Sequence, residues 1–144
     1  MTKEEFEERV YGICVVVMMG AKQELNELFE DEICSQIIEQ HMGRLIWNGN
    51  IQYEDTDTGF GFSLDNPIHT CRISQNKFYI KKLHEAKKSI IATHRYGCYR
   101  SPISGHLVDR YLVCYISGKD KISFKIIYID PYCEEMSDKF PEGF

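Results

Sequence analysis

The chain has 144 residues, of which 43% are hydrophobic and 27% are charged. These fractions are close to globular averages, so they exclude wholesale disorder, a collagen-like repeat and an integral membrane protein. A chain of this length can remove about 68 to 70% of its unfolded surface from water, which is enough for one core. We therefore expect a single domain over 1–144, with a helical part (1–43), a β-rich part (44–130) and an acidic tail (131–144).

Targeting and cysteine usage predict a cytoplasmic protein. The amino terminus is acidic and lacks the basic and apolar regions of an export signal. The longest apolar stretch, 10–19, has ten residues, against the roughly 20 that a membrane-spanning helix needs. The six cysteines include no C-x-x-C pair, which argues against structural zinc and for reduced thiols. We expect no metal, no cofactor and no membrane contact.

The first 43 residues have helical periodicity. Thr2 and Glu5 fit a capping box, in which a hydroxyl and a carboxylate bind the free N–H groups at a helix start. Apolar residues then recur every three or four positions from Phe6 to Leu28. A further helix is predicted over 31–42, and Gly43 is placed to end it. Its inward-facing residues are expected to be Ile33, Ile37 and Ile38.

Strand patterns begin after residue 43. Residues 44–47 and 50–53 flank Asn48-Gly49, the pair best suited to a type I′ turn, so they predict a β-hairpin. Further short strands are predicted at 59–64, 68–73 and 77–81. In the first of these, Phe60, Phe62 and Leu64 alternate onto one face.

The remaining segments complete an α+β pattern. Residues 82–88 favour a helical turn, and 89–96 stay open between helix and strand. The runs 107–117 and 121–129 predict an antiparallel hairpin, and the tail from Pro131 is expected to be loose. Helices before strands indicate an α+β fold, with N-terminal helices packed on one face of a mostly antiparallel sheet of about five to six strands. The other face of the sheet is expected to be exposed to solvent.

Charge is distributed unevenly along the chain. Residues 1–66 hold 4 basic and 14 acidic residues, whereas 67–127 hold 12 basic and 3 acidic residues, and the net charge of the whole chain is -5. This division points either to an anionic ligand on the basic segment or to neutralisation of that segment by the acidic helices. Charges within about 8 Å interact at physiological salt, so helices beside the basic strands can cancel their field.

Side chains suited to phosphate concentrate between residues 94 and 110. These are His94, Arg95, Tyr96, Tyr99, Arg100, Ser101, Ser104, His106 and Arg110. Arginine binds phosphate through a planar fork, and histidine exchanges protons near neutral pH. The spacing is not diagnostic, and a solvated basic loop containing ordinary turn residues is the alternative.

Arg110 is unusual because strict alternation places it on the apolar face with Val108, Leu112 and Cys114, unless a bulge shifts the register. A buried guanidinium needs a partner. That partner is a ligand anion if the face is an open cleft, or an acidic helix residue such as Glu39 if the face is core.

The leading hypothesis is binding of a phosphate-bearing ligand (RNA, DNA or a nucleotide) by the basic β-rich surface. The expected ligand-binding residues are Arg95, Tyr99, Arg100, Ser101 and Arg110. One alternative is a metal-independent ribonuclease, with His94 and His106 as base and acid and Arg100 or Arg110 stabilising the developing charge. The other is an inhibitor or immunity-type protein whose acidic N-terminal helices bind a basic protein partner. Whether any reaction is catalysed stays open.

Overall fold

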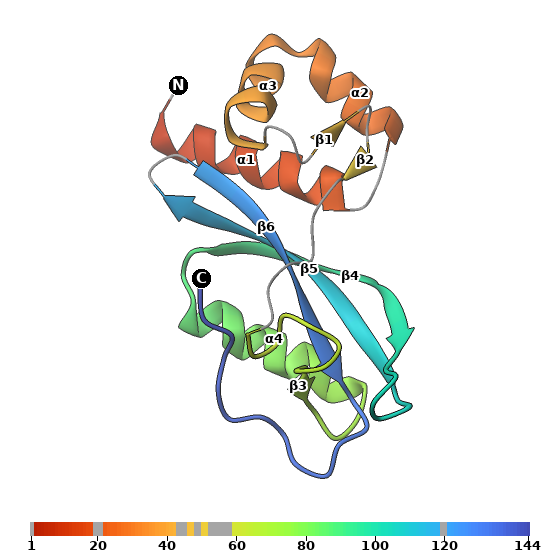
Figure 1. Cartoon of the computed structure of the whole chain (residues 1–144). Helices are drawn as coiled ribbons and strands as arrows, with labels where there is room; N and C mark the ends of the chain where they lie inside the picture. Colours follow the sequence, from red (N-terminus) through yellow and green to blue (C-terminus); the bar gives the residue numbers. More distant parts are fainter. Residues whose placement is uncertain (1, 19–21, 43–45, 48–49, 52–58, 119–120) are drawn as a thin grey trace.

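The computed structural model describes residues 2–18, 22–42, 46–47, 50–51, 59–118 and 121–144. In chain order the elements are α1 (Lys3–Met18), α2 (Lys22–Glu30), α3 (Glu32–Ile37), the π-helix η1 (Ile38–Met42), β1 (Ile46–Trp47), β2 (Asn50–Ile51), β3 (Ile68–His69), α4 (Ser74–Ala86), β4 (Ile90–Arg100), β5 (Leu107–Gly118) and β6 (Lys121–Asp130). Figure 1 shows α1 to α3 at one end of the long strands β5 and β6, and α4 beside the other end.

The predicted α+β class is confirmed, but the main sheet is smaller than expected. Within the described ranges it has four strands in the order β3-β6-β5-β4, and β1 and β2 form a separate two-stranded sheet. Strand β3 runs parallel to β6, whereas β6, β5 and β4 are antiparallel neighbours. The expected strands at 59–64 and 77–81 are absent from the sheet, which explains the difference from five to six strands.

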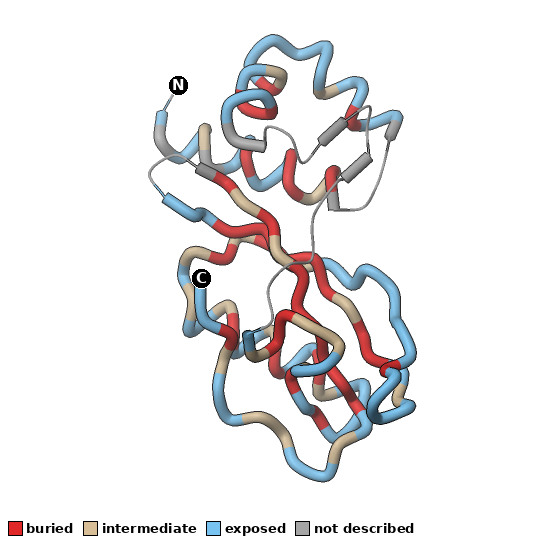
Figure 2. The backbone as a smooth tube through the Cα atoms, in the orientation of Figure 1, coloured by how far each residue is buried: buried red, intermediate tan, exposed pale blue. Residues whose placement is uncertain are grey.

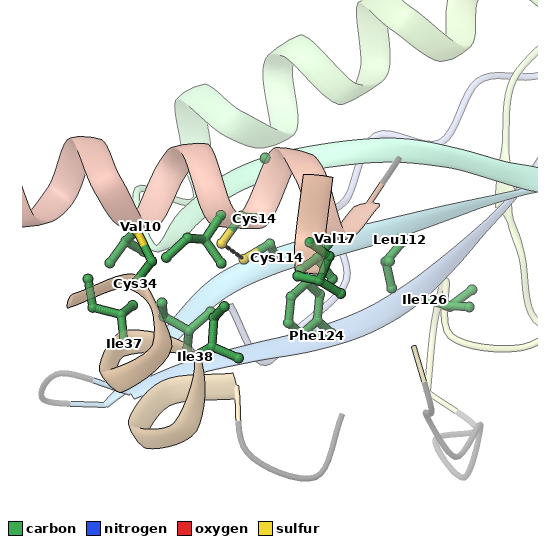
Figure 3. Close-up of a cluster of buried hydrophobic side chains, with 14 of the residues drawn as sticks. Val10, Cys14, Val17, Cys34, Ile37, Ile38, Leu112, Cys114, Phe124 and Ile126 are labelled. Carbon is green, nitrogen blue, oxygen red and sulfur yellow. Dashed lines mark hydrogen bonds between the residues drawn. The ribbon is translucent and has the colours of Figure 1, made fainter. Parts of the chain in front are cut away.

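One face of the sheet shares a buried cluster with the N-terminal helices. From α1 it includes Val10, Ile13, Cys14 and Val17, which recur on one side of the helix. From the strands it includes alternate residues of β5 and β6, among them Leu112, Cys114, Phe124 and Ile126. Figure 3 shows Cys14 and Val17 of α1 facing Cys114 and Phe124 of the strands, with the Cys114 thiol donating to Cys14 Sγ at 2.9 Å.

The opposite face of the sheet is covered by α4 and the carboxy-terminal segment, so the expectation of a solvent-exposed face is wrong. Its cluster contains Tyr111, Val113, Tyr115, Ile127 and Ile129 of β5 and β6. Tyr79 and Leu83 of α4 belong to the same cluster, and the carboxy-terminal segment adds Met136, Phe140 and Phe144. The tail from Pro131 is therefore packed and not loose, and the central strands are buried over most of their length, with the ends of β5 exposed (Figure 2).

Helix α4 replaces the strand predicted over 77–81. The buried residues of this helix are Asn76, Tyr79 and Leu83, which lie three and four positions apart on one helical face. The sequence does not show this periodicity clearly because Asn76 is polar, so the inward side of the helix does not look apolar. Of the predicted strand 68–73, only Ile68 and His69 lie in the sheet.

Residues 59–64 form turns because Gly61 adopts a φ of +83°. The Gly61 carbonyl accepts a hydrogen bond from Tyr128 N at 2.8 Å, and a Cβ at Gly61 would lie 2.7 Å from Pro141 Cγ. Phe62 belongs to the cluster under α4, whereas Leu64 packs against the cluster under α1. The expected alternation of these side chains onto one face is therefore wrong.

Several local predictions are confirmed. Glu5 N donates to Thr2 Oγ1 at 3.2 Å and Thr2 N donates to Glu5 Oε2 at 3.1 Å, which is the predicted capping box. The β5–β6 hairpin is antiparallel, as predicted. The undecided segment 89–96 lies largely in β4.

The predicted hairpin around Asn48-Gly49 and the predicted helix over 31–42 are each borne out only in part. Ile46 pairs with Ile51 and Trp47 with Asn50, but the turn itself lies outside the described residues. The helix is divided into α3 and η1, with Asp31 accepting from Cys34 N at its start. Cys34 and not Ile33 takes the buried position, because Ile33 is 39% exposed.

All six cysteines are free thiols, and Cys14, Cys34 and Cys114 are buried. The hydrogen bond to Cys14, together with burial, raises the pKa of Cys114. In the described part of the chain, no helix is long and apolar enough to cross a membrane.

His84 links stability to pH. It lies in α4 with Nε2 3.2 Å from Thr93 Oγ1 of β4, and burial lowers its pKa below the ordinary value of 6.5. The unfolded chain therefore binds more protons as the pH falls through 6.5, so the folded state loses stability there. We expect His84→Gln to reduce this loss, measured by urea unfolding between about pH 7.5 and 5.5. The control is His69→Gln at an exposed position of β3, and equal pH dependence in both variants would contradict the assignment.

Candidate nucleic-acid interface

A β-bulge in β4 places two tyrosines on the same side of the sheet. Arg95 pairs with Tyr111 and Cys98 pairs with Asp109, so three steps along β4 match two along β5. Gly97 lies inside the bulge with a φ of +94°, a conformation that glycine adopts without a Cβ penalty. In a regular strand Tyr96 and Tyr99, three residues apart, would point to opposite faces. The extra residue brings both rings to the same face.

Arg110 of β5 lies against these two rings. Its guanidinium carbon is 4.1 Å from the ring centroid of Tyr99 and 5.1 Å from that of Tyr96, which are cation–π distances. Arg110 pairs with Tyr128 and shares its face with Val108 and Leu112, as alternation predicted. Tyr96 and Tyr99 remain 37% and 48% exposed. We call Tyr96, Tyr99 and Arg110 the arginine–tyrosine stack.

Arg95 lies on the other side of the sheet. It pairs with Tyr111, a member of the cluster under α4, and its Nη2 binds Asp109 Oδ1 at 2.9 Å. This hydrogen bond raises the pKa of Arg95. The expected ligand-binding set is therefore divided between two faces.

Asp109 belongs to a buried polar network that joins α4 to the sheet. Asn76 Nδ2 donates to Asp109 Oδ2 at 2.9 Å, and Thr70 Oγ1 donates to Asn76 Oδ1 at 2.6 Å. Thr70 and Asn76 are fully buried, and Asp109 is 5% exposed. Arg95 supplies the positive charge that a carboxylate needs at this depth. The structure therefore gives Arg95 a role in holding the fold together.

Arg100 and Ser101 stabilise the turn between β4 and β5. Arg100 Nη1 donates to the Gly105 carbonyl at 2.7 Å. Ser101 is 3% exposed, and its Oγ accepts from the backbone N–H groups of Ile103 and Ser104. Of the expected ligand-binding residues, Tyr99 and Arg110 meet through a cation–π contact between β4 and β5, and sequence reasoning did not include Tyr96 with them. The Tyr96-Gly97 pair was the available signal, because glycine within a strand often marks a bulge.

The structure does not bring His94 and His106 together. His94 pairs with Leu112, six residues along β5 from His106, which corresponds to about 20 Å. The imidazole of His106 instead binds Asp130, with Nδ1 donating to Oδ2 at 2.8 Å. A single phosphodiester cannot contact two groups at that separation.

His106, Asp130 and Cys133 form a second cluster that sequence spacing did not reveal. One ligand-type atom from each lies within 4.8 Å of the others. Burial, followed by the nearby Asp130 carboxylate, raises the pKa of the Cys133 thiol to about 11. The three residues belong to different segments: the turn just before β5, the end of β6 and the carboxy-terminal segment. No local motif could have indicated them.

Comparisons of this chain with protein-family models, with curated proteins and with solved structures found no match. Functional inference therefore rests on the residues and their geometry alone.

Substitution of Gly97 tests the bulge. Gly97→Ala adds a Cβ at a φ of +94°, although nothing lies within 4 Å of it, so the expected cost is backbone strain of about 1 kcal/mol. The control is Gly12→Ala on the exposed side of α1, where alanine should stabilise the helix by about 0.5 to 1 kcal/mol. Urea unfolding measures both variants, and a stabilising Gly97→Ala would contradict the strained bulge.

Removal of Asn76 tests the buried network. Asn76→Ala removes one buried hydrogen bond from the Asp109 carboxylate, which keeps its bonds to Arg95, and one from the Thr70 hydroxyl. We therefore expect about 2 to 3 kcal/mol lower stability. Lys77→Ala, at the next and exposed position of α4, should change stability by no more than about 0.5 kcal/mol. Similar free energies of unfolding for the two variants would show that the network contributes little.

Proposed function

We propose that the arginine–tyrosine stack binds a phosphate-bearing ligand that carries a base, namely single-stranded RNA, DNA or a nucleotide. The observation that carries this proposal is the pair of partly exposed tyrosine rings holding one guanidinium between them. Aromatic faces stack on bases of any sequence, and arginine binds phosphate through a planar fork. The stack therefore offers aromatic rings for a base and a guanidinium for a phosphate within the size of one nucleotide.

Local charge supports the same proposal. The stack belongs to the segment 67–127, which has 12 basic and 3 acidic residues. His94 pairs with Leu112, so it lies on the face that carries Arg110. Asp109, the acidic residue next to Arg110, is on the opposite face and is bound to Arg95. An approaching phosphate therefore meets the guanidinium before it meets that carboxylate.

The ribonuclease alternative has weaker support than binding. Acid–base cleavage by His94 and His106 requires both imidazoles at one phosphodiester, and their positions along the sheet are far apart. A binding surface needs only the stack and its charge.

A protein-binding role has one observation in its favour. Among the N-terminal residues whose burial the structure describes, nine carboxylates are exposed: Glu4, Glu5, Glu8, Glu24, Glu27, Glu30, Asp31, Glu32 and Glu39. A basic partner would be steered by this surface. Reversal of Glu24 and Glu27 to lysine should abolish such an interaction and leave ligand binding at the stack intact.

Fluorescence polarisation with short single-stranded RNA, short DNA and nucleotides tests the proposal. Tyr99→Ala should weaken binding by about 5- to 150-fold, because stacking on one aromatic ring is worth about 1 to 3 kcal/mol. Arg110→Lys should also weaken binding, because lysine keeps the charge and loses the planar fork. Affinity of the unmodified chain for RNA or DNA should fall as salt rises.

Helix α4 provides matched controls. Phe78 is 51% exposed and Lys82 Nζ lies 4.4 Å from the Phe78 ring centroid, so this pair repeats the cation–π chemistry at a second site. Phe78→Ala and Lys82→Ala should leave affinity unchanged. Unchanged affinity in Tyr99→Ala, or an equal loss in the control variants, would refute the proposed interface.

A further inference from the structure

The cluster of His106, Asp130 and Cys133 lies at one end of the sheet. His106 immediately precedes β5, Asp130 is the last residue of β6, and Cys133 follows three positions later. Their nitrogen, oxygen and sulfur ligand atoms are all within 4.8 Å of one another. The hairpin register and the turn after β6 together produce this convergence.

Asp130 is a buried carboxylate at the end of β6. Its side chain is 4% exposed, and among the described residues its recorded ion pair is with His106, whose side chain is 39% exposed. Asp130 Oδ1 also accepts from Tyr132 N at 3.0 Å. An ionised carboxylate at this depth is costly unless it is paired with a cation or coordinates a metal.

The donor set matches a particular class of metal. Imidazole nitrogen, thiolate sulfur and carboxylate oxygen are the ligands that zinc takes in proteins. Calcium and magnesium prefer oxygen ligands, so the thiolate makes them poor candidates for this site. In a tetrahedral zinc site the ligand atoms are separated by about 3.4 to 3.6 Å. His106 Nδ1 and Asp130 Oδ2 are at 2.8 Å, so about half an ångström of side-chain movement would bring this pair to a zinc geometry.

We propose that His106, Asp130 and Cys133 form a three-ligand site for a divalent transition metal ion of the zinc class. The ion takes the position of the proton on His106 Nδ1, which passes to solvent or to Nε2 of the same ring, and the Cys133 thiol proton is released to solvent. A fourth position stays open for water or another ligand. The site does not include the arginine–tyrosine stack, so it is independent of the proposed nucleic-acid interface.

Metal binding at this site would join three segments of the chain. The segment that contains Cys133 continues to Met136, Phe140 and Phe144, which pack against the cluster under α4. An ion that ties Cys133 to the ends of β5 and β6 therefore stabilises the placement of this segment. Because the ion binds only the folded arrangement, it should raise the melting temperature.

Cobalt(II) is the probe for this proposal. The full chain is treated with a chelator, exchanged into buffer without it, and titrated with CoCl2 under reducing conditions. We expect one Co²⁺ per chain, with a thiolate-to-cobalt charge-transfer absorption and the intense visible bands of tetrahedral cobalt. Zn²⁺ should displace cobalt and raise the melting temperature. Cys133→Ser should abolish the charge-transfer absorption, and His106→Gln should weaken binding by at least about 10-fold, as loss of a ligand contact does.

Two controls separate the site from adventitious binding. Cys98→Ser removes an exposed thiol of β4, and Asp138→Asn removes an exposed carboxylate of the carboxy-terminal segment. Both should retain the cobalt spectrum and the zinc-dependent rise in melting temperature. Circular dichroism confirms that each variant is folded. Absence of stoichiometric cobalt binding, or a charge-transfer absorption retained in folded Cys133→Ser, would overturn the proposal without affecting the nucleic-acid titration.

Discussion

The fold depends on burial of β5 and β6 on both faces. Even-numbered residues such as Leu112 and Phe124 belong to the cluster with α1, whereas odd-numbered residues such as Val113 and Ile127 belong to the cluster with α4. Each fully buried aliphatic side chain contributes about 1.5 to 3 kcal/mol. Because the side-chain period of a strand is two, a one-residue slip in the hairpin would exchange the contents of both cores. The register of this hairpin is therefore strongly specified.

Against this fixed register, the β-bulge in β4 changes which side chains share a face of the sheet. The bulge at Gly97 occurs in β4, the edge strand, where an extra residue disturbs only one neighbour. It brings Tyr96 and Tyr99 to the same face as Arg110. The same face carries apolar residues further along β5, where α1 covers it. The arginine–tyrosine stack of β4 and β5 therefore lies on a sheet face that elsewhere along β5 is core.

Some polar side chains of β4 and β5 belong to a buried hydrogen-bonded network, and others belong to the arginine–tyrosine stack. Asp109 and Arg110 are adjacent in sequence but point to opposite faces. Asp109 joins Asn76 and Arg95 in a buried network, and Arg110 joins the two tyrosines. Arg95 and Arg110 look equivalent as basic residues of one segment, yet their partners give them different roles. Charge counted along the sequence therefore overstates the positive charge that one surface presents.

The sequence by itself determined the α+β class, the capping box at Thr2, the β5–β6 hairpin and the face of Arg110. Each of these depends on contacts between near neighbours or on strict alternation, which the order of residues records. Helix α4 was missed because its inward face includes Asn76, whose polar atoms find partners in Thr70, Asp109 and Tyr111 once the chain is folded. The covering of the second face was missed because the tail alone looks acidic and polar. Tertiary structure also decided which candidate residues meet, since His106, Asp130 and Cys133 converge only when β5, β6 and the following segment are folded together.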